Sequence, residues 1–308
     1  MPSKKKRLVI ILGPTGVGKS AAGVTLASRF GGEIINCDSM QVYRGFDIGT
    51  DKPTPEMRRR VPHHLLDIAG ASEQFTAADF VREAVAALRA IEERGRLPFV
   101  VGGTGLYLKA LLDGLFPGPG RNEELRRTLD REAAEKGLTG LYNRLEEADP
   151  VYARLIGPRD KIRIIRALEV FHLTGEPISE HFRRTRSQVT DFHLLKIGLK
   201  LERKDLYRMI EERVDRMFKR GLVGEVRGLL DAGVGPESPP FRALGYKRVL
   251  SHLQGGISLE EAARLTKQDT RHYAKRQISW FQKMAGVTWF PAGEPARPGA
   301  FLEEQLAD

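Results

Sequence analysis

Cysteine is almost absent from this sequence, with Cys37 the only one among 308 residues. A single thiol excludes an internal disulfide and a cysteine-cluster zinc site. The seven histidines show no metal-ligand spacing, so we interpret them as structural. A chain without disulfides suits a reducing compartment, and we therefore expect a cytoplasmic protein.

Long apolar runs are missing too. No stretch approaches the roughly 20 apolar residues of a membrane-spanning helix, so we expect no membrane contact. The start, Met1–Arg7, lacks the apolar segment of a signal peptide, and we interpret Lys4–Arg7 as a solvated basic tail. The chain has no internal repeat and no low-complexity block. No exposed apolar helix face stands out, so we expect a monomer.

Positive charge is in excess. The chain carries 50 Lys and Arg against 40 Asp and Glu, a net charge of +10, and 41% of its residues are hydrophobic. The hydrophobic content suffices for a sizeable core. The charge indicates a polyanionic partner without requiring one.

One octapeptide fits the phosphate-loop pattern G-x-x-x-x-G-K-[ST]. A buried strand is predicted before it, at Arg7–Leu12, and a helix after it. Backbone amides of such a loop face an anion, the lysine adds charge, and the serine hydroxyl is a ligand for Mg²⁺. We predict a bound diphosphate or triphosphate, held by Gly13, Pro14, Thr15, Gly16, Val17, Gly18, Lys19 and Ser20, with Mg²⁺ on Ser20.

Strand and helix patterns alternate over the first ~115 residues, which predicts an α/β fold with a P-loop parallel sheet, like that of nucleotide kinases. Thr76 is the expected cap of a helix that runs to Glu93. The expected strands after the first are Gly32–Cys37, Leu65–Ile68, Leu97–Val101 and, much later, Leu194–Leu199.

A turn-rich stretch, Leu115–Gly120, marks a boundary, and 123–186 is helical, charged and without strands. We predict an inserted all-helical subdomain at 118–189 within a discontinuous catalytic core of 1–117 and 190–308. Long helices are expected at Leu206–Leu230, with an interruption near Gly221 and Gly224, and at Leu259–Met284. The tail from Pro291 is expected to be weakly ordered.

Two polar residues follow predicted strands directly. Asp38 comes after Gly32–Cys37, and Thr104 comes after the Phe99–Gly103 stretch. Ligands of open α/β sheets bind beyond the carboxyl ends of strands, so Asp38 is a candidate base or metal ligand and Thr104 a candidate phosphate ligand. Asp38 as a turn residue and Thr104 as a helix cap remain alternatives.

Arginines and lysines gather in several groups. Arg213, Arg216 and Arg220 share one helix face, where an arginine either reaches solvent or points at the phosphate site. Three further groups favour a nucleic-acid interface over solvated helix faces. They are Arg159–Arg166, Arg183–Arg186, and the run 264–283, in which six basic residues oppose only Asp269 and aromatic residues are interleaved.

Taken in order, these motifs resemble the tRNA dimethylallyltransferase family, also called tRNA isopentenyltransferases. The most specific pair is Asp38–Tyr43 (DSMQVY) with Val101–Tyr107 (VGGTGLY). The other matching stretches are Gly13–Ser20, Arg163–Val170, Arg213–Val226, Leu244–Lys247 and Thr270–Trp280. Eukaryotic relatives carry a C-terminal zinc finger that one cysteine cannot supply, so the resemblance implies a bacterial-type member.

The resemblance implies transfer of a dimethylallyl group from dimethylallyl diphosphate to N6 of the adenosine 3′-adjacent to the anticodon, in tRNAs that read U-starting codons. Asp38 would be the catalytic base, and Thr104 and Arg213 would stabilise the leaving diphosphate with Lys19 and Mg²⁺. The inserted helices would grip the anticodon stem-loop. The implied RNA-binding residues are Asp38, Ser39, Met40, Gln41, Thr104, Arg126, Ile162, Arg163, Ile164, Ile165, Arg166, Arg242, Gly245, Tyr246, Lys247, Lys275, Arg276, Gln277 and Trp280.

Three alternatives stay open at this stage. A P-loop nucleoside or nucleotide kinase also combines a phosphate loop with an inserted helical lid, although it has no need of basic C-terminal helices. An adenylate isopentenyltransferase would act on free adenine nucleotides. An RNA-binding P-loop switch would hydrolyse a nucleotide slowly, but the sequence offers no clear switch loop.

Overall fold

The computed structural model describes residues 6–116 and 118–307. Lys4 and Lys5 of the predicted basic tail, and Pro117 of the predicted boundary turn, lie outside these residues. The chain forms two compact units. The core unit contains the residues up to Leu111 and those from Val189 onward, and the inserted unit is Leu112–Gln188.

The core unit is built on a six-stranded sheet in the order β3-β2-β4-β1-β5-β6, with every pair parallel among the described residues. This arrangement confirms the predicted α/β class. The register brings Leu12 opposite Gly102, and Cys37 opposite Gly102 on the other side. The strands are β1 (Lys6–Leu12), β2 (Gly32–Cys37), β3 (His63–His64), β4 (Leu97–Gly102), β5 (Phe192–Lys200) and β6 (Val287–Pro291).

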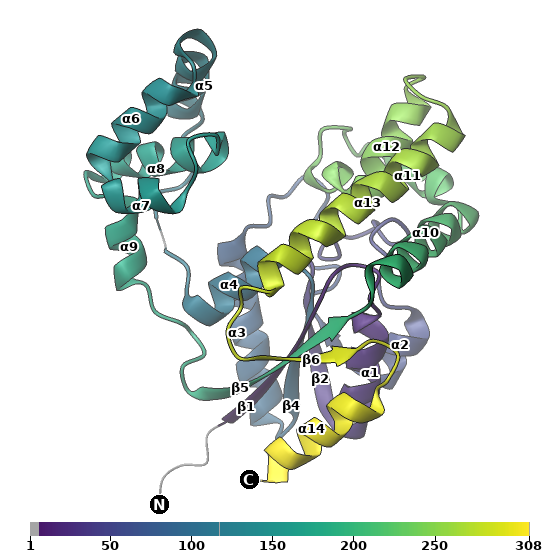
Figure 1. Cartoon of the computed structure of the whole chain (residues 1–308). Coiled ribbons are helices and arrows are strands. Elements are labelled where there is room, and N and C mark those ends of the chain that lie inside the picture. The colour runs from purple at the N-terminus through teal and green to yellow at the C-terminus, as the bar shows by residue number, and fades with distance from the viewer. Residues whose placement is uncertain (1–5, 117, 308) are drawn as a thin grey trace, which may run out of the picture. The chain divides into compact units, whose positions relative to one another are not determined.

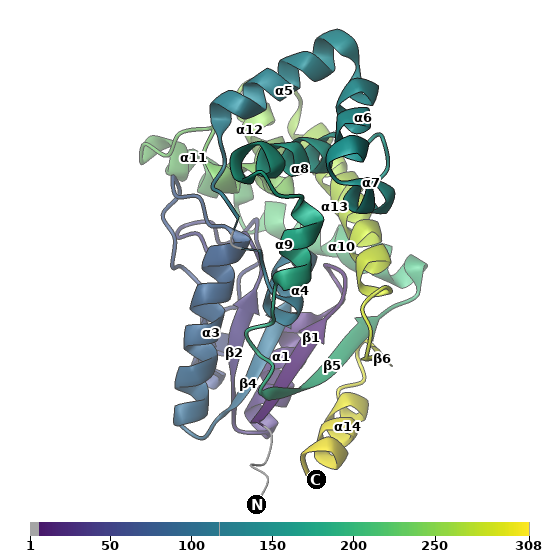
Figure 2. The same cartoon turned by 90° about the vertical axis from the view of Figure 1, so that its left-hand side faces the viewer.

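Helices cover both faces of the sheet, as Figures 1 and 2 show. One face packs on α1 (Lys19–Arg29) and α14 (Ala296–Ala307), with Val9 and Ile11 of β1 pointing into that layer. The other carries α3 (Ala77–Glu93) and α4 (Gly105–Asp113), whose rings Phe80 and Tyr107 stack with centroids 4.4 Å apart. Thr76 caps α3 as predicted, in a reciprocal capping box with Asp79.

A helical layer completes the core unit. It consists of α10 (Arg203–Lys219), α11 (Leu222–Asp231), a short 3₁₀ helix (Pro239–Arg242), α12 (Leu244–Leu253) and α13 (Leu259–Phe281). The short α2 (Pro55–Arg60) instead contacts α1, and its Met57 packs against the core cluster of the sheet. The predicted break near Gly221 separates α10 from α11, because Gly221 has a φ of 95°. Phe46, Phe241 and Tyr246 lie at the centre of a second hydrophobic cluster here.

Two predictions for the core unit are wrong. Leu65–Ile68 is not a strand, because Leu65 and Asp67 have left-handed φ values of 61° and 57°; the short strand is the preceding His63–His64. The tail is not weakly ordered either. Directly after β6 it forms α14, and Leu302 of α14 is fully buried against the sheet.

The inserted unit is entirely helical within its described residues, as predicted for 123–186. Its helices are α5 (Glu123–Lys136), α6 (Leu138–Ala148), α7 (Pro150–Leu155), α8 (Lys161–Thr174) and α9 (Ile178–Arg184). Their apolar faces enclose a core that includes Leu129, Leu141, Leu145 and Ile164. Across both units, no described helix is long and apolar enough to cross a membrane.

A buried carboxylate ties the inserted unit together. Glu169 has a fully buried side chain and accepts hydrogen bonds from Arg126 (2.8 Å), Arg166 (2.6 Å) and the Asn122 amide (2.8 Å). Burial by itself raises the pKa of Glu169, but these bonds outweigh it and hold the pKa at about 2. The carboxylate is therefore charged, and it links α5 to α8.

Parallel strands place their carboxyl ends at one edge, and this positions the candidate site. The phosphate loop follows β1, Asp38 follows β2, and Thr104 lies two residues beyond β4. Because β2, β4 and β1 are neighbours in the sheet, these three segments meet.

The buried position of α14 gives a test of the corrected tail. We expect Leu302→Ala to lower the free energy of unfolding by about 2–5 kcal/mol, because it opens a cavity between α14 and the sheet. Glu304→Ala, on the exposed side of α14, is the control and should change it by under ~0.5 kcal/mol. Urea unfolding of both variants measures the difference, and equal stability would mean that α14 does not contribute to the core.

Candidate functional site

The phosphate loop curls tightly between β1 and α1. Gly13 has a φ of 148°, and a Cβ there would lie 2.6 Å from the Leu199 carbonyl oxygen, so only glycine fits. Lys19 donates from Nζ to the Pro14 carbonyl at 2.8 Å and points back across the loop. Burial and the neighbouring Arg213 charge lower the pKa of Lys19 to about 8, while Asp38 acts in the opposite direction. An anion bound in the loop would stabilise the charged form of Lys19 against burial and the Arg213 charge.

Asp38 is held by its own turn. Its Oδ1 accepts hydrogen bonds from the amides of Met40 (2.9 Å) and Gln41 (3.3 Å). The turn role that sequence reasoning left open is therefore real, and it orients the carboxylate. Thr104 lies beside this turn, where its Oγ1 accepts a hydrogen bond of 3.1 Å from the Ser39 amide. Asp38 and Thr104 therefore both hydrogen-bond to the backbone of the turn that follows β2.

Arg213 points from α10 into the site. Its Nη1 hydrogen-bonds Thr15 Oγ1, its Nη2 donates to the Thr50 carbonyl at 3.4 Å, and its Nε lies 2.9 Å from an Asp51 carboxylate oxygen. The side chain is only 18% exposed, against 59% for Arg216. Although Nε is close to Asp51, the two atoms are not aligned for a hydrogen bond. Among the described residues, Arg213 Nε is the only buried side-chain nitrogen or oxygen without a hydrogen-bond partner. A charged donor in that state fits an anionic ligand.

Two adjoining cavities meet at these residues. One, of about 240 Å³, is lined by the phosphate loop, Lys19, Ser20 and Asp51. The other, of about 320 Å³, is lined by Arg242, Gly245, Tyr273 and Arg276 among others. Both include Thr15, Asp38 and Arg213 in their walls. One cavity therefore presents anion-binding groups, the other presents an aromatic and basic wall, and Asp38 lies between them.

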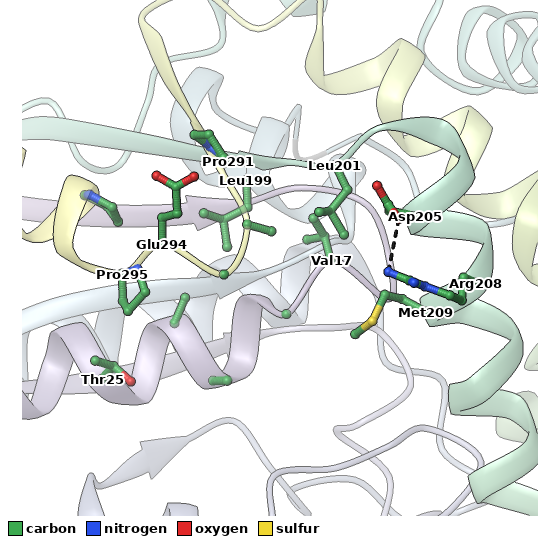
Figure 3. Close-up of a pocket in the computed structure, with 16 residues that line it drawn as sticks. Val17, Thr25, Leu199, Leu201, Asp205, Arg208, Met209, Pro291, Glu294 and Pro295 are labelled. Atoms are coloured by element: carbon green, nitrogen blue, oxygen red, sulfur yellow. Dashed lines mark hydrogen bonds and ion pairs between the residues drawn. The ribbon is translucent and has the colours of Figure 1, made fainter.

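A third cavity, of about 510 Å³, adjoins the phosphate side and is drawn in Figure 3. Leu199, Leu201 and Val17 form an apolar wall, and Asp205 and Arg208 pair across 3.0 Å at its edge. It shares Gly18, Ala21 and Met209 with the phosphate cavity but no residue with the cavity on the far side of Asp38. Although it is the largest of the three, none of Lys19, Asp38 and Arg213 lines it, so it lies beside the candidate site and not within it.

The phosphate cavity has the donors that Mg²⁺ prefers. Ser20 lies at the start of α1, and the carboxylates of Asp38 and Asp51 line the same cavity. Hard oxygen donors suit Mg²⁺, which is commonly bound through one or two protein groups plus substrate phosphates. No cluster of three or more His, Cys, Asp or Glu residues suited to a metal occurs in the described chain, so a metal here would depend on the phosphates.

Several residues predicted to bind RNA are buried. Ile164 and Ile165 belong to the core of the inserted unit, and Tyr246 is fully buried against Phe46, so their side chains face no solvent. Gln41 is also buried and donates to the Thr50 and Asp51 carbonyls. RNA contact by these residues therefore stays a prediction. For Ile164, Ile165 and Tyr246, helix spacing does not distinguish the packed face from the exposed one, and Gln41 lies in a turn.

Other predicted RNA-binding residues are accessible. Ile162 is 79% exposed in the inserted unit, and Trp280 is 37% exposed in the core unit. Arg163 of the inserted unit is exposed, as are Arg242, Lys247, Lys275 and Arg276 of the core unit.

The structure pairs many of the clustered basic residues with acids. Arg264, Lys267 and Arg271 of α13 contact Glu261, Asp215 and Glu211 at 2.6–2.7 Å. Arg183 and Arg184 contact Glu180 and Glu176 at 2.7 and 2.9 Å. By contrast, Lys275 and Arg276 make no ion pair with a residue in 6–116 or 118–307, and Arg276 lies over the Tyr273 ring. The free positive charge on α13 therefore lies next to the aromatic cavity.

Sequence reasoning missed three residues that shape the site. Asp51 contacts both Arg213 and, at 3.6 Å, Arg220. Glu225 accepts hydrogen bonds from the amides of Asp47, Ile48 and Gly49, which fixes the loop that presents Asp51. Asp51 lies outside every matching stretch, and Glu225 lies within Arg213–Val226, where no pattern distinguishes it from its neighbours. Tyr273 was noted only as one of several aromatic residues; burial raises its pKa, so the phenol stays protonated.

Comparison with known proteins identifies relatives along nearly the whole chain. The family model for IPP transferase matches residues 41–284. A curated tRNA dimethylallyltransferase from Geobacter sulfurreducens is 50% identical over 290 residues, covering 94% of this chain and 93% of its own. One from Geobacter metallireducens is 51% identical, covering 93% of each chain.

Solved structures agree. A tRNA isopentenylpyrophosphate transferase from Bacillus halodurans has a TM-score of 0.73 and 42% identity, covering 98% of this chain and 97% of that one. A eukaryotic dimethylallyltransferase acting on tRNA has a TM-score of 0.80 and 30% identity, covering 98% of this chain and 77% of that one. With the family model matched over most of its length, the chain belongs to the IPP transferase family, the family of the tRNA dimethylallyltransferases.

Proposed function

We propose that this chain transfers the dimethylallyl group of dimethylallyl diphosphate to N6 of the adenosine 3′-adjacent to the anticodon, in tRNAs that read U-starting codons. The observation that carries the proposal is the position of Asp38 between an anion-binding cavity and an aromatic, basic cavity. The names of the relatives favour this reaction over phosphoryl transfer.

The two cavities suit the two substrates. The phosphate loop, Lys19 and Arg213 receive the diphosphate, and the cavity with Tyr273 and Arg276 receives the adenine. A stacked base cannot reach an internal wall, so the adenosine enters flipped out of the anticodon loop. Its amine then lies near Asp38, between the cavities.

In the chemical step, N6 attacks C1 of the allyl group, an N–C bond forms, and the C1–O bond breaks with its electron pair passing to the diphosphate. The proton on N6 moves to Asp38, whose Oδ1 is tied to two amides and whose Oδ2 is the oxygen available to accept it. An exocyclic purine amine is a weak nucleophile, so proton removal during attack lowers the barrier.

Charge grows on the departing diphosphate, and the site presents cationic and hydroxyl donors to it. Arg213 and Lys19 supply positive charge, and the Thr104 hydroxyl supplies a donor. Ser20 and the neighbouring carboxylates would hold Mg²⁺, which when bound supplies further positive charge to the diphosphate oxygens.

For the RNA, the exposed basic residues of the core unit are the favoured contacts: Arg276 lines the adenine cavity, and Lys275 precedes it on α13. The inserted unit offers Ile162 and Arg163, and we assign it the anticodon stem-loop. The ion-paired arginines contribute less net charge to either surface.

The base assignment is tested by Asp38→Asn. With radiolabelled dimethylallyl diphosphate and bulk tRNA, the wild type should label the RNA, and Asp38→Asn should lower the single-turnover rate by about 10²–10⁴. Asp231→Asn, at the exposed end of α11, is the matched control and should leave the rate unchanged. Near wild-type turnover in Asp38→Asn would remove Asp38 from this role, and γ-phosphate transfer from ATP to a nucleotide in place of RNA labelling would establish the kinase alternative.

The leaving-group assignment separates two arginines of α10. Arg213→Ala should lower the single-turnover rate by about 10²–10³, the usual effect of deleting one transition-state donor. Arg216→Ala should change it much less, because that side chain, although it also lines the phosphate cavity, is 59% exposed and makes only a long ion pair of 3.9 Å with Glu212. Pyrophosphate affinity measured in parallel separates ground-state binding from catalysis. The reverse order of effects would show that Arg216 is the phosphate ligand.

The RNA assignment is tested by salt dependence. Replacing Lys275 and Arg276 by alanine should flatten the slope of log Kd against log salt by about 0.7–0.9 for each RNA phosphate that the variant no longer binds. The Arg183→Ala/Arg184→Ala pair should have a smaller effect, because both arginines are already paired with glutamates. If neither pair changes the slope on an anticodon stem-loop, these surfaces do not bind RNA.

A further inference from the structure

The inner face of α13 lies against the loops of the site. Tyr273, Gln277 and Trp280 occupy that face at i, i+4 and i+7. Gln277 is the most buried of the three, at 6% exposed. Its Oε1 accepts a hydrogen bond of 2.8 Å from the Thr15 amide, and its Nε2 donates one of 2.8 Å to the Gly103 carbonyl.

These two bonds reach loops that follow neighbouring strands. Thr15 belongs to the phosphate loop after β1, and its hydroxyl also contacts Arg213. Gly103 follows β4 and directly precedes Thr104. One side chain therefore joins the segment that holds the diphosphate to the segment that carries the Thr104 hydroxyl.

The glycines around Thr104 are explained by the same helix. A Cβ on Gly103 would lie 2.5 Å from Gln277 Nε2, and a Cβ on Gly105 would lie 2.6 Å from Trp280 Nε1. A Cβ at Gly103 would displace the Gln277 amide from its hydrogen bond, and a Cβ at Gly105 would displace the Trp280 ring. The Gly-Gly-Thr-Gly sequence is thus shaped by contact with α13 as well as by ligand access.

We propose that Gln277 is a positioning residue for the transfer reaction, which fixes the phosphate loop and Thr104 relative to each other, and is not an RNA contact. The inference rests on the proposed function. Both partners of Gln277 are backbone groups, so without it a part-buried amide and a buried carbonyl lose their hydrogen bonds. Lys275 and Arg276 lie on the exposed side of the same helix, so RNA contact and loop geometry share one rigid element.

The test uses Gln277→Met, which keeps the side-chain length and removes both hydrogen bonds. The single-turnover rate at saturating substrates should fall by about 10- to 100-fold, the scale expected when reacting groups shift by about 1 Å. Pyrophosphate affinity should fall several-fold, and tRNA affinity should stay within about twofold. Gln268→Met, on the same helix and half-buried, is the matched control and should behave as the wild type.

A double-mutant cycle with Thr104→Ala separates positioning from general destabilisation. If Gln277 acts through Thr104, its substitution should cost much less in the Thr104→Ala background, whereas a merely structural effect would be the same in both. Thermal melts accompany each variant. Should Gln277→Met fail to fold, Gln277→Glu keeps the acceptor for the Thr15 amide, loses the donor to Gly103, and carries the same test.

Three outcomes overturn the inference: a wild-type rate in Gln277→Met, additive costs in the cycle, or a loss of tRNA affinity with an unchanged rate at saturating RNA. The last would make Gln277 an RNA contact after all. Failure of the proposed function is recognised separately, because then the wild type itself would not label tRNA. The pyrophosphate measurement would still report whether Gln277 holds the phosphate loop.

Discussion

The parallel pairing of β2, β4 and β1 is the constraint on which the site depends. In a parallel sheet the strands end at the same edge, and the register sets Cys37 and Leu12 on either side of Gly102. Segments that are 20 to 90 residues apart in sequence, the phosphate loop, the Asp38 turn and the Thr104 loop, therefore become neighbours. The two helical faces of the sheet bury Val9, Ile11 and Phe80, which keeps that edge rigid.

The long α10–α13 layer gives the fold its second side wall. Arg213 reaches the phosphate loop from α10, Gln277 reaches it from α13, and Glu225 of α11 fixes the loop that carries Asp51. In each of these contacts the partner is a polar group of a loop at the edge of the sheet: the Thr15 hydroxyl for Arg213, the Thr15 amide for Gln277, and the Ile48 amide for Glu225. Hydrogen bonds and ion pairs have defined directions. They therefore fix the orientation of the loops more closely than apolar packing would.

Charge is arranged differently from what a count of Lys and Arg indicates. Many arginines of the described chain are matched with nearby acids, including the buried Glu169 set that links α5 to α8. Exposed pairs of this kind contribute about 0–1 kcal/mol each. The net charge of +10 is therefore not spread evenly over the basic motifs. Within α13, Arg264, Lys267 and Arg271 are paired with acids, whereas Lys275 and Arg276 have no acid partner among the described residues.

The sequence by itself determined the fold class, the strand–loop–helix at Gly13–Ser20, the strands before Asp38 and Thr104, and the helical character of 123–186, because these depend on local periodicity, glycine and capping. It also determined the family, through motifs of high specificity. Only the tertiary structure decided that the tail after β6 folds as α14 and that Tyr246 and Gln277 are buried. It also decided that Arg213 is largely buried against the phosphate loop, whereas Arg216, which lines the same cavity, is largely exposed. These outcomes depend on which face of a helix packs against an element that is distant in the sequence. Helix spacing shows which residues share a face, but it does not show whether that face is packed or exposed.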